Sequence, residues 1–309
     1  MRLPDVEDQM LAKWATAPLL LRCKEKEKVD EVCRYGRSNA CKREKAPLLL
    51  LCKEKELEDE VLSATAKPKN KNMNWKKSLS ISFKIYAPQN VSTQLGTSGG
   101  SISLKNLSGS QNFSTSGGSL SLDGLSGEVT GRTSGGSINV SNSKDQLDLS
   151  TSGGSISADN CTGNLKLNTS GGSLKLSQLN GMIKANTSGS SINGDNISGE
   201  LSTHTSGGSI KLTDMICSLE TSTSGGHIDV AIKQFGKYLK INNSGGNIDL
   251  QIPKNKGIDM DLSARKINAG TVENFKGTMN DDTIKGTLNG GGIPVTINAG
   301  SGRITLTMN

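Results

Sequence analysis

The chain has 309 residues, of which only 3% are aromatic while 37 are glycine. So few large side chains argue against a conventional globular core and favour a narrow, repetitive one. The net charge of +7 lies mostly at one end, because residues 1–77 carry 18 Lys and Arg against 13 Asp and Glu, a net of +5, which leaves +2 for the rest. The charge is therefore no evidence that the body of the chain binds an acidic partner.

Residues 1–72 are expected to form an N-terminal extension that is irregular or partly helical. They contain an imperfect duplication, "APLLLRCKEKEKVDEV" from Ala17 and "APLLLLCKEKELEDEV" from Ala46. Runs of Lys and Glu are typical of short exposed helices, since opposite charges four residues apart attract. Two interpretations stay open: a disordered extension, or a start site assigned upstream of the true one.

The N-terminal sequence carries no recognisable export or membrane signal. The opening "MRLPDVEDQMLAKW" is acidic where a signal peptide has a basic region, so no signal peptide is expected. No run approaches the ~18 apolar residues of a spanning helix, so no transmembrane segment is expected. The six cysteines show no CxxC spacing, and we expect free thiols rather than a zinc site.

Residues 73–309 are expected to form one β-solenoid domain. A cover at residues 73–96 comes first, in which "SLSISFKIYAP" from Ser78 alternates apolar and polar side chains as a strand does. Residues 250–309 break the repeat described next but still alternate, and they are expected to form a C-terminal cap. A solenoid needs such covers because its open strand edges invite polymerisation.

Regular coils are predicted for residues 97–249. The hexapeptide "TSGGSI" begins at Thr97 and recurs, with variants, every 18 residues up to Thr223; the next step, to Asn243, is 20 residues. Apolar residues five, seven, 14 and 16 positions after the Thr line the inner faces of two short strands, which bury those faces only by stacking. The pattern predicts an all-β fold, a single-chain parallel β-helix (β-solenoid) of eight or nine 18-residue coils, for which the crossover rule favours the right hand.

The third residue of the hexapeptide is glycine in every coil, and we expect it to form a corner that needs positive φ. The fourth residue is expected to have less need of glycine, because Ser190 replaces glycine there in one coil. A need that recurs in every coil is structural rather than catalytic. The predicted structural turn positions are Gly99, Gly117, Gly135, Gly153, Gly171, Gly189, Gly207 and Gly225.

Departures from the repeat are where a site would lie, and none of them indicates catalysis. His204 and His227 are expected to be exposed corner residues, and their spacing is a weak basis for a metal site. Cys161 occupies a core slot and is expected to act as a small hydrophobe. The run from Ser143 to Asp145 replaces the usual turn and is expected to form an outward loop. No catalytic residue, cofactor or metal ligand is therefore predicted.

Aromatic residues are missing from the whole stretch between Ser114 and Gln234. Grooves that bind sugars or single-stranded nucleic acid commonly use aromatic platforms, so no nucleic-acid partner is expected. Contacts with a ligand would therefore come from rows of stacked polar side chains, from the caps, or from three aromatic side chains: Phe235, Tyr238 and Tyr86.

The repeats lie between "KIYAPQNVSTQLGTSGGSISLKNLSG" from Lys84 and "IKGTLNGGGIPVTINAGSGRITL" from Ile284. Together these segments resemble a bacterial adhesin-like family, a domain of unknown function also met as head-GIN adhesin-like domains, over about residues 75–309. The resemblance implies a β-solenoid in the cell envelope or outside the cell, without established catalytic residues or cofactor. The missing signal peptide and residues 1–70 depart from the family's pattern.

Three functions remain open at this stage. The first is a non-enzymatic envelope protein that contacts an unknown surface ligand, a glycan or a protein. The second is an intracellular scaffold that self-associates end to end, which the missing signal peptide favours. The third is an enzyme acting on polysaccharides, since some parallel β-helices cleave acidic glycans; fold alone does not decide among them.

Overall fold

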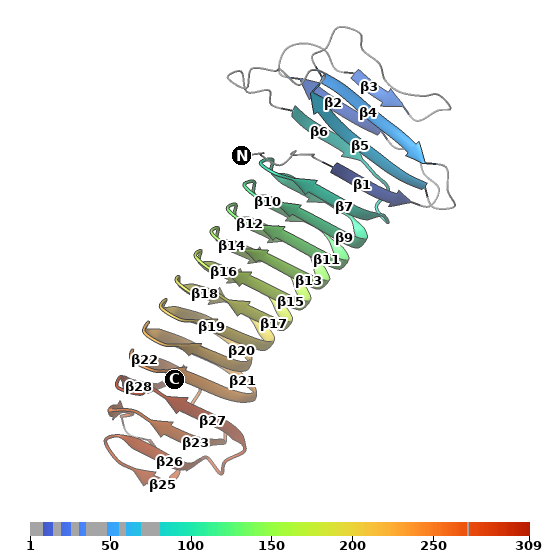
Figure 1. The fold of residues 1–309 in the computed structure, drawn as a ribbon. Helices are drawn as coiled ribbons and strands as arrows, with labels where there is room; N and C mark the ends of the chain where they lie inside the picture. The colour runs from blue at the N-terminus through green and yellow to red at the C-terminus, as the bar shows by residue number, and fades with distance from the viewer. Residues whose placement is uncertain are drawn as a thin grey trace, which may run out of the picture.

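The computed structural model describes residues 9–14, 20–25, 31–34, 48–55, 60–68, 81–270 and 272–309, with side chains from Phe83 onward. The repeats form a rod of stacked coils (Figure 1). It is an all-β parallel β-solenoid of about nine turns with 18-residue coils, as predicted. No helix occurs in the part of the chain that is described, and so none there could cross a membrane.

Each coil contributes one short strand to a first stack and one longer strand to a second. The first stack contains β8 (Ile102–Lys105), β10 (Leu120–Asp123), β12 (Ile138–Ser141), β14 (Ile156–Asp159), β16 (Leu174–Ser177) and β18 (Ile192–Asp195). The second contains β7 (Ser92–Thr97), β9 (Ser108–Thr115), β11 (Ser126–Thr133), β13 (Lys144–Thr151), β15 (Thr162–Thr169), β17 (Asn180–Asn186) and β19 (Ser198–Thr205). The long strands β20 (Ile210–Thr223) and β21 (Ile228–Asn243) serve both stacks, and β22 (Ile248–Ile252) belongs to the first.

The register between coils follows the sequence period. Ile138 pairs with Ile156 in the first stack, and Leu147 pairs with Leu165 in the second, each 18 residues apart. The side chains at the four predicted inner positions stack on their own equivalents and are buried throughout the regular coils. Parallel pairing in register therefore produces the core directly from the repeat.

The corner Thr is also buried, which the sequence pattern did not indicate. Thr151 is 5% exposed; its hydroxyl donates to the Gly136 carbonyl at 2.8 Å and accepts the Gly154 amide at 3.2 Å. One hydroxyl thus closes its own corner and ties it to the coil before. The same donation to the preceding coil is made by Thr115, Thr133, Thr169, Thr187, Thr205 and Thr223.

The prediction that the corner glycines are needed for positive φ is wrong. None of the eight third-residue glycines has φ in the left-handed region, and all are exposed. A Cβ on Gly153 would come no closer than 3.6 Å to its nearest neighbour, whereas one on Gly154 would lie 2.0 Å from the Gly136 carbonyl oxygen. The fourth residue is therefore the position that requires glycine, because the backbones of neighbouring coils touch there. Positive φ occurs at other corners, for example at Asn142 and Gly127.

Ser190 at the fourth position misled the sequence interpretation. Its hydroxyl donates to the Gly171 carbonyl at 2.8 Å, and strand β17 ends at Asn186 instead of continuing to the corner Thr as its neighbours do. The coil that contains Ser190 thus accommodates a Cβ at the fourth position because its strand ends one residue early.

The described parts of residues 9–68 form strands, although helices were expected from the Lys and Glu runs. β1 (Gln9–Trp14) pairs antiparallel with β7 and with β5 (Glu60–Pro68), and β5 pairs with β4 (Leu48–Lys55). A separate sheet contains β2 (Leu20–Glu25), β3 (Glu31–Arg34) and β6 (Ile81–Tyr86). The free edge of β7 offers unpaired backbone groups, and pairing there outweighs the weak attraction between charges along an isolated helix. Residues 69–80, which include part of the expected cover, lie outside the described residues.

The C-terminal region is not stacked in chain order. Its strands are β23 (Ile258–Ser263), β24 (Lys266–Asn268), β25 (Phe275–Met279), β26 (Thr283–Leu288), β27 (Ile293–Asn298) and β28 (Arg303–Met308). β27 lies between β21 and β23, and β28 lies between β22 and β24, all in parallel. The antiparallel strands β26 and β25 then cover the end of the second stack (Figure 1).

Replacing Gly154 by Ala should destabilise the protein by about 1–3 kcal/mol, because the new methyl group overlaps the Gly136 carbonyl. The matched change Gly153→Ala should alter stability by less than about 1 kcal/mol, since that corner has room. Urea unfolding of both variants measures the difference. Equal losses, or a larger loss for Gly153→Ala, would contradict the assignment of the close contact to the fourth residue.

Candidate functional site

The side wall of the regular coils is interrupted at the 20-residue coil that begins at Thr223. Cys217 pairs with Phe235 and Leu219 pairs with Leu239, so Ser218 faces the three residues from Gly236 to Tyr238. This β-bulge absorbs the two extra residues of the coil. Bulges of this kind re-aim side chains and occur often beside functional sites.

Gly236 allows the bulge to lie against the preceding coil. A Cβ at this position would lie 2.3 Å from the Ser218 backbone nitrogen, so a larger residue does not fit without movement. The Ser218 side chain is buried, and its Oγ accepts the Lys237 amide at 2.8 Å. The bulge is thus held by a hydrogen bond rather than left as a loose loop.

The bulge directs Tyr238 back along the outer face of the second stack. The Tyr238 hydroxyl donates to Glu200 Oε1 at 3.1 Å, which lies two coils earlier, so the half-buried side chain crosses the coil of Ser218. Met182, in the coil before that of Glu200, pairs with Glu200 in register, and its side chain is 55% exposed. An aromatic ring, a carboxylate and an exposed thioether therefore follow one another along the rod.

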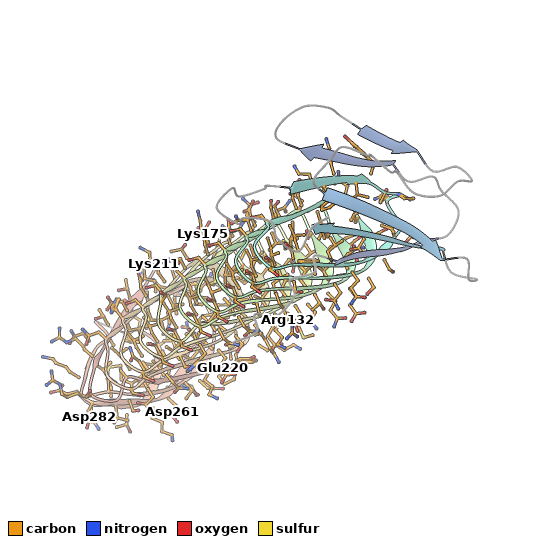
Figure 2. All side chains as sticks on the ribbon, turned by 45° about the horizontal axis from the view of Figure 1, so that its top comes forward. Arg132, Lys175, Lys211, Glu220, Asp261 and Asp282 are labelled. Atoms are coloured by element: carbon orange, nitrogen blue, oxygen red, sulfur yellow. The ribbon has the colours of Figure 1, made fainter. Side chains whose placement is uncertain are left out.

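A second row of side chains runs beside this one. Lys240 Nζ lies 2.8 Å from Glu220 Oε1. Lys240 comes two residues after Tyr238 on β21, and Glu220 comes two residues after Ser218 on β20. Figure 2 shows Glu220 on the same side of the rod as Arg132 and Asp261, opposite Lys175 and Lys211. We call the patch formed by Met182, Glu200, Glu220, Tyr238 and Lys240 the Tyr238 surface.

The environment of Tyr238 keeps its phenol protonated. Partial burial, the hydrogen bond to Glu200 and the negative charges of Glu200 and Glu220 all raise the pKa of Tyr238. The hydroxyl is therefore a hydrogen-bond donor at physiological pH and orients the ring. The patch combines this oriented aromatic side chain with carboxylate acceptors and one ammonium group.

The other two aromatic candidates behave differently. Phe235 is only 8% exposed and belongs to the core, so it is not available for recognition. Tyr86 is 45% exposed and lies under the Lys84 ammonium group, whose Nζ is 4.9 Å from the ring centroid. Met182 and Glu200 were not among the residues predicted to form a site, and the 20-residue step was the only feature of the sequence that pointed to this region.

The two histidines are exposed, as expected, but His204 lies in strand β19 and not at a corner, and the two side chains have separate partners. His204 Nδ1 lies 2.8 Å from Ser222 Oγ, and His227 Nε2 lies 3.2 Å from Asp249 Oδ2. Within the described residues no three His, Cys, Asp or Glu side chains gather in a way that could hold a metal ion.

The run from Ser143 to Asp145 does not form the outward loop that was expected. Ser143 is buried in the core slot, where its Oγ accepts the Leu125 amide at 3.1 Å and donates to the Ser141 carbonyl at 2.8 Å. Asp145 adopts φ of 78° at the position where other coils have glycine, and its carboxylate accepts the Gly127 amide at 2.9 Å. Side-chain hydrogen bonds thus replace the missing apolar residue and the missing glycine.

Comparison with known proteins places the second half of the chain in a recognised group. The family model described as Toastrack DUF4097 matches residues 144–307, a span that includes the Tyr238 surface and runs from the start of β13 into β28. No curated protein and no solved structure matches the chain significantly.

Replacing Glu200 by Gln should lower the pKa of Tyr238 toward its ordinary value, because one of the two nearby negative charges is removed. The raised pKa stabilises the fold below the pH at which an unfolded tyrosine ionises, and this contribution is lost as pH rises through the folded pKa. Ultraviolet titration of tyrosinate measures the shift, with Tyr238→Phe subtracted to remove the other tyrosines. An unchanged titration curve would show that Glu200 does not contact the phenol in solution.

Cys161 and Cys217 should resist alkylation in the folded protein at pH 8. Both are buried free thiols; burial raises the pKa of Cys161 and raises the pKa of Cys217 to about 12, so little thiolate forms. Peptide mass spectrometry after iodoacetamide treatment separates them from the four N-terminal cysteines. Modification of either residue without prior unfolding would contradict its place in the core.

Proposed function

The chain belongs to the Toastrack DUF4097 family, and from that premise we propose that it is a non-enzymatic β-solenoid of the bacterial cell envelope that binds a surface glycan through the Tyr238 surface. The observation that carries this proposal is the two-residue bulge that directs Tyr238 along an otherwise repetitive wall. A protein ligand is the other outcome of the test described below.

The chemistry of the Tyr238 surface supports a glycan. A tyrosine ring offers an apolar face to the C–H groups of a sugar, and carboxylates accept hydrogen bonds from its hydroxyl groups. Glu200, Glu220 and Lys240 supply such polar groups beside the ring. The row from Met182 to Tyr238 follows the rod axis, so a chain-like ligand would meet successive coils.

The electrostatics of Asp123, on the first stack, do not suit the proton donor of a glycoside hydrolase. Glycoside hydrolysis needs one carboxyl group with a raised pKa to act as the acid. Asp123 on the first stack instead accepts hydrogen bonds from Asn142 and Ser141, which lower its pKa, and Lys105 lies 4.0 Å away. Asp123 therefore stays ionised and is a poor proton donor.

The C-terminal end of the rod argues against an end-to-end scaffold. The edge of β24 is covered by the turn before β26, because the Ala264 and Ile267 amides donate to the Asp282 and Asp281 carbonyls. β25 and β26 cover the neighbouring stack, and Figure 2 shows Asp282 at this end. The covered edge of β24 cannot template a further strand, and β25, whose outer edge is open, is only five residues long, which is typical of edge strands that resist further pairing.

Binding to a panel of immobilised bacterial polysaccharides and envelope fragments tests the proposal. Tyr238→Ala should weaken binding by about 2 kcal/mol or more, roughly thirtyfold in Kd, as expected for an aromatic anchor. Tyr238→Phe should retain most of the affinity, and Tyr86→Ala serves as the control for an exposed tyrosine elsewhere. Equal binding by Tyr238→Ala and the unaltered protein would remove the Tyr238 surface from the proposal.

Location is tested separately, by fractionating native cells and detecting peptides of the chain. We expect the protein in the envelope or medium. Recovery from the cytosol alone would contradict the envelope assignment while leaving the binding measurement valid.

A further inference from the structure

The last coil of the rod, residues 293–309, fills a slot made by earlier parts of the chain. β27 pairs with β21 on one side and β23 on the other, and β28 pairs with β22 and β24 (Figure 1). The slot is therefore complete before residue 293 is reached in the sequence. We call residues 293–309 the C-terminal coil.

The C-terminal coil fits its slot as a regular coil fits the stack. A Cβ on Gly302 would lie 2.0 Å from the Gly246 carbonyl oxygen, and one on Gly246 would lie 2.0 Å from that of Gly226. Ile304 pairs with Ile248 on one side and with Ile267 on the other. These contacts depend on the sequence of the coil and not on the chain that supplies it.

One short linker ties the C-terminal coil to the rest of the chain. It runs from Asn289 to Gly292 between β26 and β27, which lie on opposite sides of β23, so it passes around the start of that strand. The Gly292 amide donates to Asp259 Oδ2 at 3.2 Å, and the Ile293 amide donates to the Gly257 carbonyl at 3.2 Å. Its three glycines have φ of 88°, 77° and 136°, backbone values that other residues rarely adopt.

We propose that a second copy of this chain can supply the C-terminal coil, which gives a dimer with exchanged coils. An exchanged dimer keeps every contact of the coil, and only the linker changes, so the balance between monomer and dimer is set by the linker and by concentration. Leu239 pairs with Val295, so exchange would place the coil of one copy next to the Tyr238 surface of the other. Two binding surfaces on one particle would raise avidity for a repetitive ligand.

Shortening the linker tests the proposal. Deletion of Gly290 and Gly291 should prevent β27 from reaching the slot of its own chain. The variant should then have twice the chain mass by light scattering, with an unchanged circular dichroism spectrum. Insertion of two glycines after Gly291 is the matched control and should leave a monomer. A shortened variant that is a native-like monomer would overturn the proposal.

Cross-linking in the full chain decides the question should the shortened variant not fold. Lys240 and Thr296 are exposed register partners on β21 and β27, so Lys240→Cys is placed in one copy and Thr296→Cys in another. After the copies are unfolded and refolded together, a short bismaleimide should link the two new cysteines between chains, as mapped by mass spectrometry. The yield should rise with protein concentration and be lost when each copy is refolded alone before mixing. Absence of the linked peptides at every concentration would overturn the exchange.

Discussion

The contact between neighbouring backbones at the corners sets the geometry of the whole rod. At the fourth residue of the hexapeptide, every coil after the first, except the one that contains Ser190, presents a glycine to the carbonyl oxygen of the coil before, at a distance that leaves no room for a side chain. The buried corner Thr then bonds to the same carbonyl and to its own corner. With this corner fixed, register, strand spacing and the inward position of the apolar residues all follow, because every coil is aligned on the previous one.

Regularity of this kind leaves few places for recognition, and this gives the bulge opposite Ser218 its significance. Most outward side chains of the coils are small and polar, and many bond to their equivalents in the adjacent coil, as Asn160 does to Asn142 and Asn186 to Asn168. Such ladders satisfy their own hydrogen-bonding groups. The bulge instead turns an aromatic side chain across the ladder, and Gly236 and Ser218 hold it there.

The sequence predicted the local period well and the contacts between distant segments poorly. The spacing of "TSGGSI" was sufficient to predict the fold class and inner residues such as Ile156 and Leu165. In a stacked repeat, the residues that pair between neighbouring coils are separated by a constant number of positions in the sequence. Recurrence alone did not distinguish a glycine needed for positive φ from one needed for close approach, and Ser190 pointed to the wrong position. The strand β1 escaped prediction because its partner β7 lies far along the chain. The 20-residue step marked an insertion, but the contact of Tyr238 with Glu200, 38 residues earlier, follows from the way the coils stack and not from any local pattern.

The interior position of the C-terminal coil has a consequence for how the protein is made. Coils before β22 can stack one after another as the chain leaves the ribosome, since each needs only its predecessor. β23 and β24 have no such neighbour until residues 293–309 have been synthesised, because their parallel partners β27 and β28 come last. Synthesis of residues 293–309 therefore completes the stack between strands that were made earlier, and a chain that lacks these residues would leave an exposed strand edge on β21 and β22.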